Sequence, residues 1–259
     1  MNTPQLRVTA LSKAFGGVLA VDQVSFDLAP ARVNSIIGPN GAGKTTLLNL
    51  LTGIYAPSSG TVAFDGADVT GLAPHQLAAR GMARTFQNPQ IFFNMSALEN
   101  VMVGRHLRER SGWLAAMLRS ARLKTAERES RAEAAELLRF VGLGEYLDAE
   151  ADAMPYGALK RLEIARALGG KPKLLLLDEP AAGLNQTETQ AINALITRLA
   201  KSGVTVVLVE HNMRLVMGVS DHILVLDYGR KLCEGTAEHV RNDPKVIEAY
   251  LGSAEQAAC

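Results

Sequence analysis

The stretch GPNGAGKTT, residues Gly38–Thr46, decides the fold. It matches the phosphate-loop pattern G-x-x-x-x-G-K-[ST] and lies between a β-rich run, Val33–Ile37, and a helical run, Lys44–Leu51. The glycines allow backbone N–H groups to surround phosphate oxygens, and the dipole of the following helix favours negative charge there. Lys44 supplies a positive charge for the phosphates, and the Thr45 hydroxyl is a ligand for Mg²⁺.

A second motif supplies the metal and water chemistry that such a loop requires. The run Leu174–Leu177 predicts a buried strand, and Asp178 and Glu179 follow it directly. Asp178 is expected in the Mg²⁺ shell, and Glu179 is placed to take a proton from an attacking water as general base. His211 follows another predicted strand, Val204–Val209, at a carboxyl end where ligand sites collect in open α/β sheets. We expect it to contact the γ-phosphate or the water.

The pattern along the rest of the chain predicts a mixed β and α/β core with a helical insertion at roughly 97–155. Short β-rich runs dominate the N-terminal third, and strands alternate with helices after residue 173, which is typical of a mostly parallel sheet. Ser96 and Glu99 form a capping box that predicts a helix start near Ala97. The predicted elements, besides those above, are strands Leu6–Leu11, Val24–Leu28, Thr61–Phe64, Met82–Phe86, His222–Leu226 and Lys231–Glu234, and helices Trp113–Val141, Gln190–Ala200 and Met213–Val219.

Length and composition are those of an ordinary globular protein. The 259 residues are 47% hydrophobic and 20% charged, which excludes disorder as the main state. The formal net charge of +1 gives no indication of nucleic-acid binding. The two cysteines, Cys233 and Cys259, form no metal-ligand spacing and exclude a disulfide framework. The first residues lack the apolar core of a secretory signal, and no run is long enough to cross a membrane, so we expect contact with a membrane only through a partner.

Five segments carry a more specific signal, namely Phe15–Val21, Ala83–Gln87, Tyr156–Arg166, Asp178–Asn185 and Pro244–Gly252, and they span nearly the whole chain. They resemble the LivG-type ATP-binding subunits of ABC importers for branched-chain amino acids, and their relatives for amides and urea. The resemblance implies a P-loop ABC ATPase fold of the α/β class with an antiparallel β subdomain and an inserted helical subdomain. The expected core is 1–96 and 156–259 of one nucleotide-binding domain, and the expected helical subdomain is 97–155.

The same resemblance implies the cofactors, ATP and Mg²⁺, and the remaining site residues. Phe15 matches the aromatic residue that stacks on adenine. Gln87 matches a residue that contacts Mg²⁺ and the attacking water and reports to the membrane subunits. The expected catalytic residues are Glu179, His211 and Gln87, and the expected metal ligands are Thr45, Gln87 and Asp178. The expected nucleotide-binding residues are Phe15, Gly38, Pro39, Asn40, Gly41, Ala42, Gly43, Lys44, Thr45, Thr46, Tyr156 and Gly157.

One motif departs from the general ABC pattern. The family works as a dimer in which each nucleotide lies between one chain's phosphate loop and the other chain's signature, Leu-Ser-Gly-Gly-Gln; the segment Gly183–Asn185 crosses the dimer seam. The residues aligned with the signature here are Met154, Pro155, Tyr156, Gly157 and Ala158. Proline offers the γ-phosphate neither a hydroxyl nor an N–H, although the following helix retains its dipole. We therefore expect slow hydrolysis by the isolated chain and a second, different ATPase subunit as partner, with a homodimer as the alternative.

A basic segment, Arg105–Arg131, has a net charge of +5 and apolar residues at helical spacing. It indicates either a solvated helix face, which we favour, or a surface for anionic lipid or the membrane subunits.

The predicted function is that of the ATPase subunit of an importer for a polar, amino-acid-like solute, at the cytoplasmic face of the membrane. The implied partners are membrane permease subunits and, indirectly, a periplasmic solute-binding protein, with no nucleic acid. Two alternatives remain open, namely a subunit of a lipid or lipopolysaccharide exporter and a non-transport ABC ATPase that acts on DNA or ribosomes. The single phosphate loop and the absence of sustained heptads disfavour the second alternative.

Overall fold

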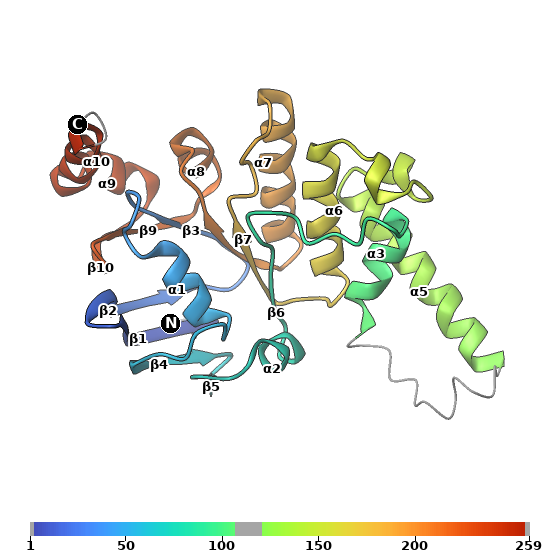
Figure 1. Ribbon diagram of the computed structural model, residues 1–259, viewed down its shortest axis with the longest axis horizontal. Helices are drawn as coiled ribbons and strands as arrows, with labels where there is room; N and C mark the ends of the chain where they lie inside the picture. Colours follow the sequence, from blue (N-terminus) through green and yellow to red (C-terminus); the bar gives the residue numbers. More distant parts are fainter. Residues whose placement is uncertain (1–2, 107–120, 257–259) are drawn as a thin grey trace.

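In residues 3–106 and 121–256, which the computed structural model describes, a six-stranded sheet forms the centre (Figure 1). Its order is β10-β9-β3-β8-β7-β6; the neighbours from β9 to β6 are parallel, and β10 pairs antiparallel with β9. A four-stranded antiparallel sheet has the order β2-β1-β4-β5. The strands are β1 (Leu6–Phe15), β2 (Val18–Leu28), β3 (Val33–Ile37), β4 (Ser59–Phe64), β5 (Ala67–Asp68), β6 (Met82–Arg84), β7 (Leu174–Asp178), β8 (Thr205–Val209), β9 (His222–Asp227) and β10 (Arg230–Gly235).

The helices cover both faces of the central sheet, with α1 between the two sheets and α7 and α8 on the opposite face (Figure 1). This arrangement, together with the antiparallel sheet, agrees with the predicted α/β class. The helices are α1 (Lys44–Leu51), α2 (Pro74–Ala79), α3 (Ala97–Gly104), α5 (Ala121–Phe140), α6 (Tyr156–Leu168), α7 (Gln186–Lys201), α8 (Met213–Val219), α9 (Ala237–Asn242) and α10 (Pro244–Gln256), with 3₁₀ turns η2 (Gly144–Tyr146) and η3 (Ala151–Ala153).

Strand β7 shows how the central sheet separates two hydrophobic cores. Successive side chains of a strand point to opposite faces. Leu174 and Leu176 join the core that contains α1 and the antiparallel sheet, whereas Leu175 and Leu177 join the core that contains α3, α5, α6 and α7. All four leucines are buried, as expected for a parallel strand covered on both faces. The leucine run is therefore a core strand that holds Asp178 at its end.

Helix α3 packs closely on α6. The predicted capping box begins α3: the Glu99 N–H donates to Ser96 Oγ, and the Ser96 N–H donates to the Glu99 carboxylate. At the other end, a Cβ on Gly104 would lie 2.0 Å from the carbonyl oxygen of Arg166 on α6. Glycine at this position allows the two backbones to approach, so α3 and α6 form one packed unit beside the central sheet.

Strands β1 and β2 run on past the predicted Leu11 and Val24 because they pair with each other up to Phe15 and Val18. Side-chain hydrogen bonds explain two other differences from the predicted boundaries. Helix α7 begins at Gln186 rather than Gln190, because Asn185 and Glu188 form a second capping box. Strand β6 ends at Arg84 rather than Phe86, because the Phe86 N–H donates to the carboxylate of Glu163 on α6. Of the predicted helix 113–141, residues 121–140 form α5, and residues 107–120 lie outside the described part of the chain.

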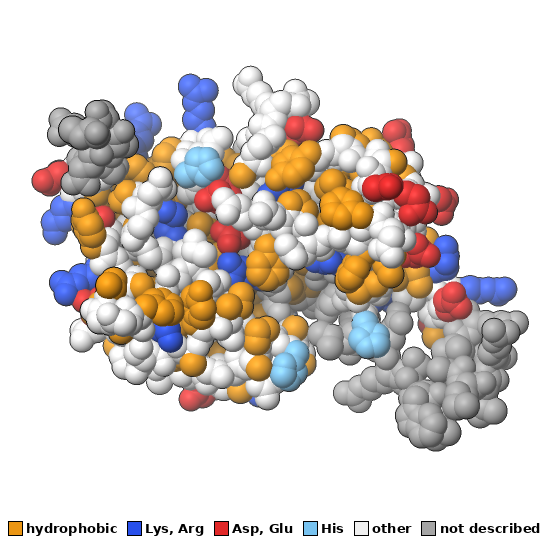
Figure 2. Space-filling view, in the orientation of Figure 1, with side chains coloured by type: hydrophobic (Ala, Val, Ile, Leu, Met, Phe, Trp, Pro, Cys, Tyr) orange, Lys and Arg blue, Asp and Glu red, His pale blue; other side chains and the backbone are white. Residues whose placement is uncertain are grey.

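The surface around the helical segment is partly acidic. Acidic side chains gather over the stretch between α5 and α6 (Figure 2), where Glu145, Asp148, Glu150 and Asp152 are exposed. Arg105 of the predicted basic segment is buried and donates to Ser130 and Glu133, so it belongs to the interior rather than to a solvated face. Among the described helices, none has both the length and the apolar character that crossing a membrane requires.

Candidate nucleotide site

Most of the predicted functional residues come together at one edge of the central sheet. Strands β3, β8, β7 and β6 are parallel neighbours, so the loops at their carboxyl ends lie side by side. Those loops carry, respectively, the phosphate loop, His211, the pair Asp178 and Glu179, and Gln87.

Two glycines allow the phosphate loop to pass close to strands of both sheets. Gly38 has a φ of 153°, and a Cβ there would lie 2.1 Å from the carbonyl oxygen of Leu226 on β9. Gly43 has a φ of 95°, and a Cβ there would lie 2.5 Å from the carbonyl oxygen of Ala20 on β2. A larger residue at either position would push the loop away from the strands. The loop is therefore held between the two sheets before α1 begins at Lys44.

Lys44 turns back over the phosphate loop. Its Nζ donates to the carbonyl oxygens of Gly38, at 2.7 Å, and Pro39, at 2.9 Å. Burial lowers the pKa of Lys44, and attraction to Glu179 and Asp178 opposes that shift. The cation thus lies in the loop itself and interacts with the carboxylates across the site.

The start of α1 is open for an anion. Its cap position is Gly43, which makes no side-chain cap, and its first turn contains no acidic residue. Thr45, which is exposed, and Thr46 lie in that first turn. The other predicted loop residues, Pro39, Asn40, Gly41 and Ala42, precede it. Uncapped N–H groups beside a lysine are what a nucleotide's phosphates require, so the residues present fit ATP.

Asp178 forms a buried ion pair at the end of β7. Its Oδ2 lies 2.8 Å from the Arg84 guanidinium on β6, and the two side chains are 9% and 7% exposed. Arg84 also donates to Asn49 Oδ1 and Thr52 Oγ1 at the end of α1. Arg84 was not among the predicted site residues, yet it fixes the carboxylate expected to hold Mg²⁺. A carboxylate oxygen with the exposed Thr45 hydroxyl at the start of α1 is a suitable donor set for that cation.

Glu179 and Gln87 are in direct contact, because Gln87 Nε2 donates to Glu179 Oε2 at 2.9 Å. Glu179 has a φ of 46°, a costly conformation for a residue with a side chain, and its N–H donates to the carbonyl oxygen of Val209 on β8. His211 Nδ1 lies 3.8 Å from the same carboxylate oxygen, which is too far for a hydrogen bond, and its side chain is 66% exposed. The structure thus joins Gln87 to Glu179 and places His211 at the border of the site.

A buried carboxylate that was not predicted organises the backbone behind these residues. Glu210, 1% exposed, accepts the N–H groups of Ala181, His211 and Asn212. It therefore ties the turn after β8 to the turn after Glu179. The sequence signal for it was a carboxylate at the end of a buried strand, where a charge must find partners.

Lys160 on α6 is a third unpredicted residue at the site. It is 2% exposed, and its Nζ donates to the carbonyl oxygens of Gln87, at 2.6 Å, and Glu179, at 3.3 Å. Burial lowers the pKa of Lys160, against the attraction of nearby carboxylates, first among them Glu163. One lysine thus joins the two residues predicted to handle the water.

Glu163, one turn further along α6, holds the same loop through two of its backbone N–H groups. It is 2% exposed, and its carboxylate accepts the N–H groups of Phe86, at 3.1 Å, and Gln90, at 3.3 Å. Burial raises the pKa of Glu163, and the two backbone hydrogen bonds partly oppose this. Helix α6 therefore grips the loop that carries Gln87 with two buried charges of opposite sign.

The signature residues lie against the segment between β7 and α7. Pro155 is the N-cap residue of α6 and makes no side-chain cap. A Cβ on Gly183 would lie 3.1 Å from the Tyr156 ring, and a Cβ on Gly157 would lie 2.3 Å from Glu188 Oε1. Tyr156 remains 43% exposed. The start of α6 thus packs on the Gly183 segment and presents an aromatic ring to the outside.

Phe15 is exposed rather than part of the core. It ends β1 at the tip of the first hairpin, is 41% exposed and contacts the Tyr55 ring edge-to-face at 5.2 Å. The Lys13 ammonium lies 5.1 Å from its ring centroid. The partner strand β2 contacts the phosphate loop, where Ala20 lies against Gly43.

A strand, a glycine-rich loop with its lysine, and a helix N-terminus define a phosphate-loop nucleotide-binding protein, and Glu179, which attracts Lys44 of that loop, adds a carboxylate to the site. The family model for the ABC transporter matches residues 21–182. A second, for the branched-chain amino acid ATP-binding cassette transporter, matches residues 230–256. The chain belongs to the ABC transporter family, as an ATPase cassette of the LivG type.

Individual relatives agree over almost the full length. A high-affinity branched-chain amino acid transport ATP-binding protein of Pseudomonas aeruginosa is 46% identical over 98% of this chain and 100% of its own. Its Escherichia coli counterpart is 44% identical with the same coverage. A nucleotide-free ATP-binding cassette from an ABC transporter, a crystal structure, superposes with a TM-score of 0.84 at 34% identity, over 96% of this chain and 99% of the other. These findings confirm the predicted fold and the predicted type of subunit.

Proposed function

We propose that this chain hydrolyses ATP with Mg²⁺ and thereby powers the import of branched-chain amino acids, or of a related amino-acid or amide solute. The contact of Gln87 with Glu179 carries this proposal, because it fixes a carboxylate that also attracts Lys44 of the phosphate loop. The similarity to transport proteins from two bacteria supports the choice of solute class over the exporter and the non-transport alternatives.

The proposed division of labour follows the geometry. Lys44 and the N–H groups at the start of α1 bind the phosphates, and Phe15 stacks on the adenine. Thr45, Asp178 and Gln87 hold Mg²⁺, which neutralises phosphate charge when bound. Tyr156 and Gly157 serve the nucleotide of a partner chain.

Glu179 accepts the proton of the attacking water while Gln87 orients its carboxylate, and His211 contacts the γ-phosphate from the exposed side of the site. The products are ADP and inorganic phosphate.

The decisive test is Glu179→Gln. The amide cannot accept a proton, so turnover should fall by about 10²–10⁴-fold while ATP affinity is retained. Phosphate release and equilibrium nucleotide binding measure the two quantities, and Glu145→Gln, an exposed carboxylate between α5 and α6, is the matched control. Turnover of the Glu179 variant within about threefold of the wild type would show that another group is the base.

A cleft of about 470 Å³ between the core and α6 is the surface we propose for a permease subunit. Its rim carries apolar side chains that are 39–43% exposed, namely Ile54, Phe86, Phe92 and Val103. Its polar lining includes Arg84, which pairs with Asp178, and Glu163, which holds the loop of Gln87. An apolar segment of the permease seated here would contact the residues that position both the metal ligand and the catalytic loop.

The remaining partners follow from the family. A dimeric post-hydrolysis ATP-binding cassette bound to ADP and phosphate is 25% identical with a TM-score of 0.75, over 90% of this chain and 98% of the other. We propose a dimer here too, with a second ATPase subunit or with itself, at the cytoplasmic face of the membrane, and an indirect link to a periplasmic solute-binding protein. We also propose that residues 97–155 act as the helical subdomain between core segments 1–96 and 156–259.

A further inference from the structure

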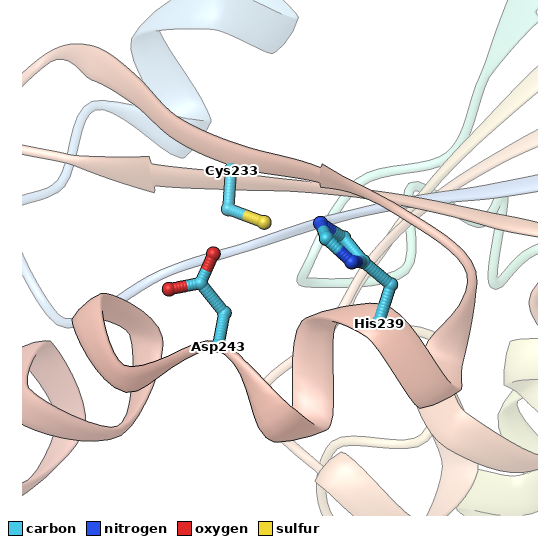
Figure 3. A group of neighbouring side chains, drawn as sticks. All are labelled: Cys233, His239 and Asp243. Atoms are coloured by element: carbon cyan, nitrogen blue, oxygen red, sulfur yellow. The ribbon is translucent and has the colours of Figure 1, made fainter.

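Three side chains near the C-terminal helices converge on one small space (Figure 3). Cys233 points from β10, His239 from α9, and Asp243 from the turn between α9 and α10. One ligand atom of each, the sulfur, an imidazole nitrogen and a carboxylate oxygen, lies within 4.8 Å of the other two. None of these residues belongs to the nucleotide site.

Local structure aims each side chain at that space. The pairing of β10 with β9 shifts by one residue between Lys231 and Cys233, and such a bulge re-aims the side chains that follow it. Thr236 caps α9 by accepting the His239 N–H. Gly235 makes room for the imidazole, because a Cβ there would lie 2.7 Å from His239 Cδ2. The ring is therefore held over the cysteine.

Asp243 is fixed as firmly as the ring. Its Oδ1 accepts the N–H of Lys245 at the start of α10, and its carboxylate also accepts a hydrogen bond from the Cys233 thiol. A shallow depression of about 450 Å³ opens beside the cluster, and both His239 and Asp243 line it. An ion can therefore reach the ligand atoms from solvent without displacing an element of the fold.

We propose that Cys233, His239 and Asp243 bind one Zn²⁺ or a similar transition-metal ion. Thiolate, imidazole and carboxylate are the three ligand types that zinc uses, and the thiolate discriminates against Mg²⁺. Ligand atoms on one tetrahedral zinc lie roughly 3.5 Å apart, so small side-chain rotations close the present spacing. The thiol proton leaves to solvent on binding, water takes the fourth position, and two ligand charges balance the ion.

The site joins the edge of the central sheet to α10, and α10 reaches the phosphate loop. A second cleft is lined by Pro39 and Gly41 of that loop and by Lys245 and Glu248 of α10. Asp243 directly precedes Pro244, the first residue of α10. Metal bound at Asp243 would therefore fix the start of α10, and with it the helix beside the phosphate loop.

The test uses the full chain with Cys259→Ser, which leaves Cys233 as its single thiol, after treatment with a chelator and without nucleotide. Titration with Co²⁺ should give a thiolate-to-cobalt charge-transfer absorption that saturates at one ion per chain, and Zn²⁺ should abolish it. Cys233→Ser should eliminate the absorption. His239→Gln and Asp243→Asn should each weaken Zn²⁺ binding, measured by calorimetry, by at least about 100-fold, the upper end of what loss of an outer-shell partner costs.

His75→Gln is the matched control, because His75 is an exposed histidine on α2, and it should leave the Zn²⁺ affinity unchanged. Circular dichroism without metal establishes that each variant is folded. The proposal is overturned if the folded Cys259→Ser chain shows no charge-transfer absorption. It is equally overturned if Zn²⁺ affinity is the same with and without Cys233, since the three side chains then form only a hydrogen-bonded cluster.

Discussion

Replacement of Lys160 by methionine tests the most unusual contact of the site. Methionine has nearly the same length and fills the same space, but it cannot donate to the carbonyl oxygens of Gln87 and Glu179, which Lys160 contacts at 2.6 and 3.3 Å. A buried acceptor left without a partner costs about 1–3 kcal/mol. The Glu179 carbonyl oxygen also accepts the Ala182 N–H, so the Gln87 carbonyl oxygen is the one left without its partner, and relief from burying an ammonium group offsets part of this cost.

We therefore expect Lys160→Met to lower the free energy of unfolding by about 1–2 kcal/mol, measured by urea denaturation followed with circular dichroism. Both carbonyls that Lys160 contacts belong to residues predicted to handle the water, so kcat should fall at least tenfold while KM changes little. Lys160→Gln, which keeps a neutral donor, should recover part of both losses. Lys201→Met, at an exposed lysine in the last turn of α7, is the control and should change neither quantity.

A loss of stability below about 0.5 kcal/mol together with turnover within twofold of the wild type would refute this reasoning. It would mean that the carbonyls find other donors, and that α6 does not position Gln87 and Glu179 through this lysine.

Three further predictions concern single side chains. Lys44→Ala should weaken ATP binding itself, and unchanged affinity in an equilibrium nucleotide titration would contradict the phosphate-loop assignment. Burial raises the pKa of Glu163, so its stabilising contribution is complete below the ordinary pKa of 4.5 and is lost as the pH rises through the folded-state pKa. Glu163→Gln keeps an acceptor for the backbone, so it should be at least as stable as the wild type at pH 8. Its gain in stability over the wild type should be smallest at pH 4. A melting temperature below that of the wild type at pH 8 would contradict this. Pro155→Ser restores a hydroxyl at the start of α6 and should raise turnover about tenfold. This is less than the roughly 10²–10³-fold in rate that loss of a preorganised donor can cost. Turnover equal to that of the wild type would show that the hydroxyl is dispensable.

Local sequence patterns predicted the elements whose determinants are local. Strand Val33–Ile37 and helix Lys44–Leu51 have the predicted bounds, because hydrophobic pattern and loop glycines lie within one short stretch. Helix α7 begins four residues before its predicted start, at the capping pair Asn185 and Glu188. That signal is also local, but the prediction did not use it. Strand β6 was predicted too long because its end depends on Glu163, 77 residues away.

The same distinction applies to the site. Sequence motifs indicated the residues expected to touch the nucleotide, and the structure brings Lys44, Asp178, Glu179 and Gln87 together. The residues that hold them, Arg84, Lys160 and Glu210, were not predicted. Arg84 meets Asp178 across 94 positions, and Lys160 meets Gln87 across 73. Such charges carry no local pattern, and only the folded chain shows what each one contacts.

The spacing of three side chains along α6 has a mechanical consequence. The exposed ring of Tyr156 and the two buried charges, Lys160 and Glu163, lie within about two turns, or roughly 10 Å, of one regular helix. A helix this short moves as a rod, so a push on its first turn is delivered to the loop of Gln87. In a dimer, one end of this rod would touch the neighbour's nucleotide while its middle positions the residue beside the chain's own. ATP hydrolysis at the two sites of such a dimer would therefore be coupled, because each chain would pass movement at its partner's nucleotide to its own Gln87 loop.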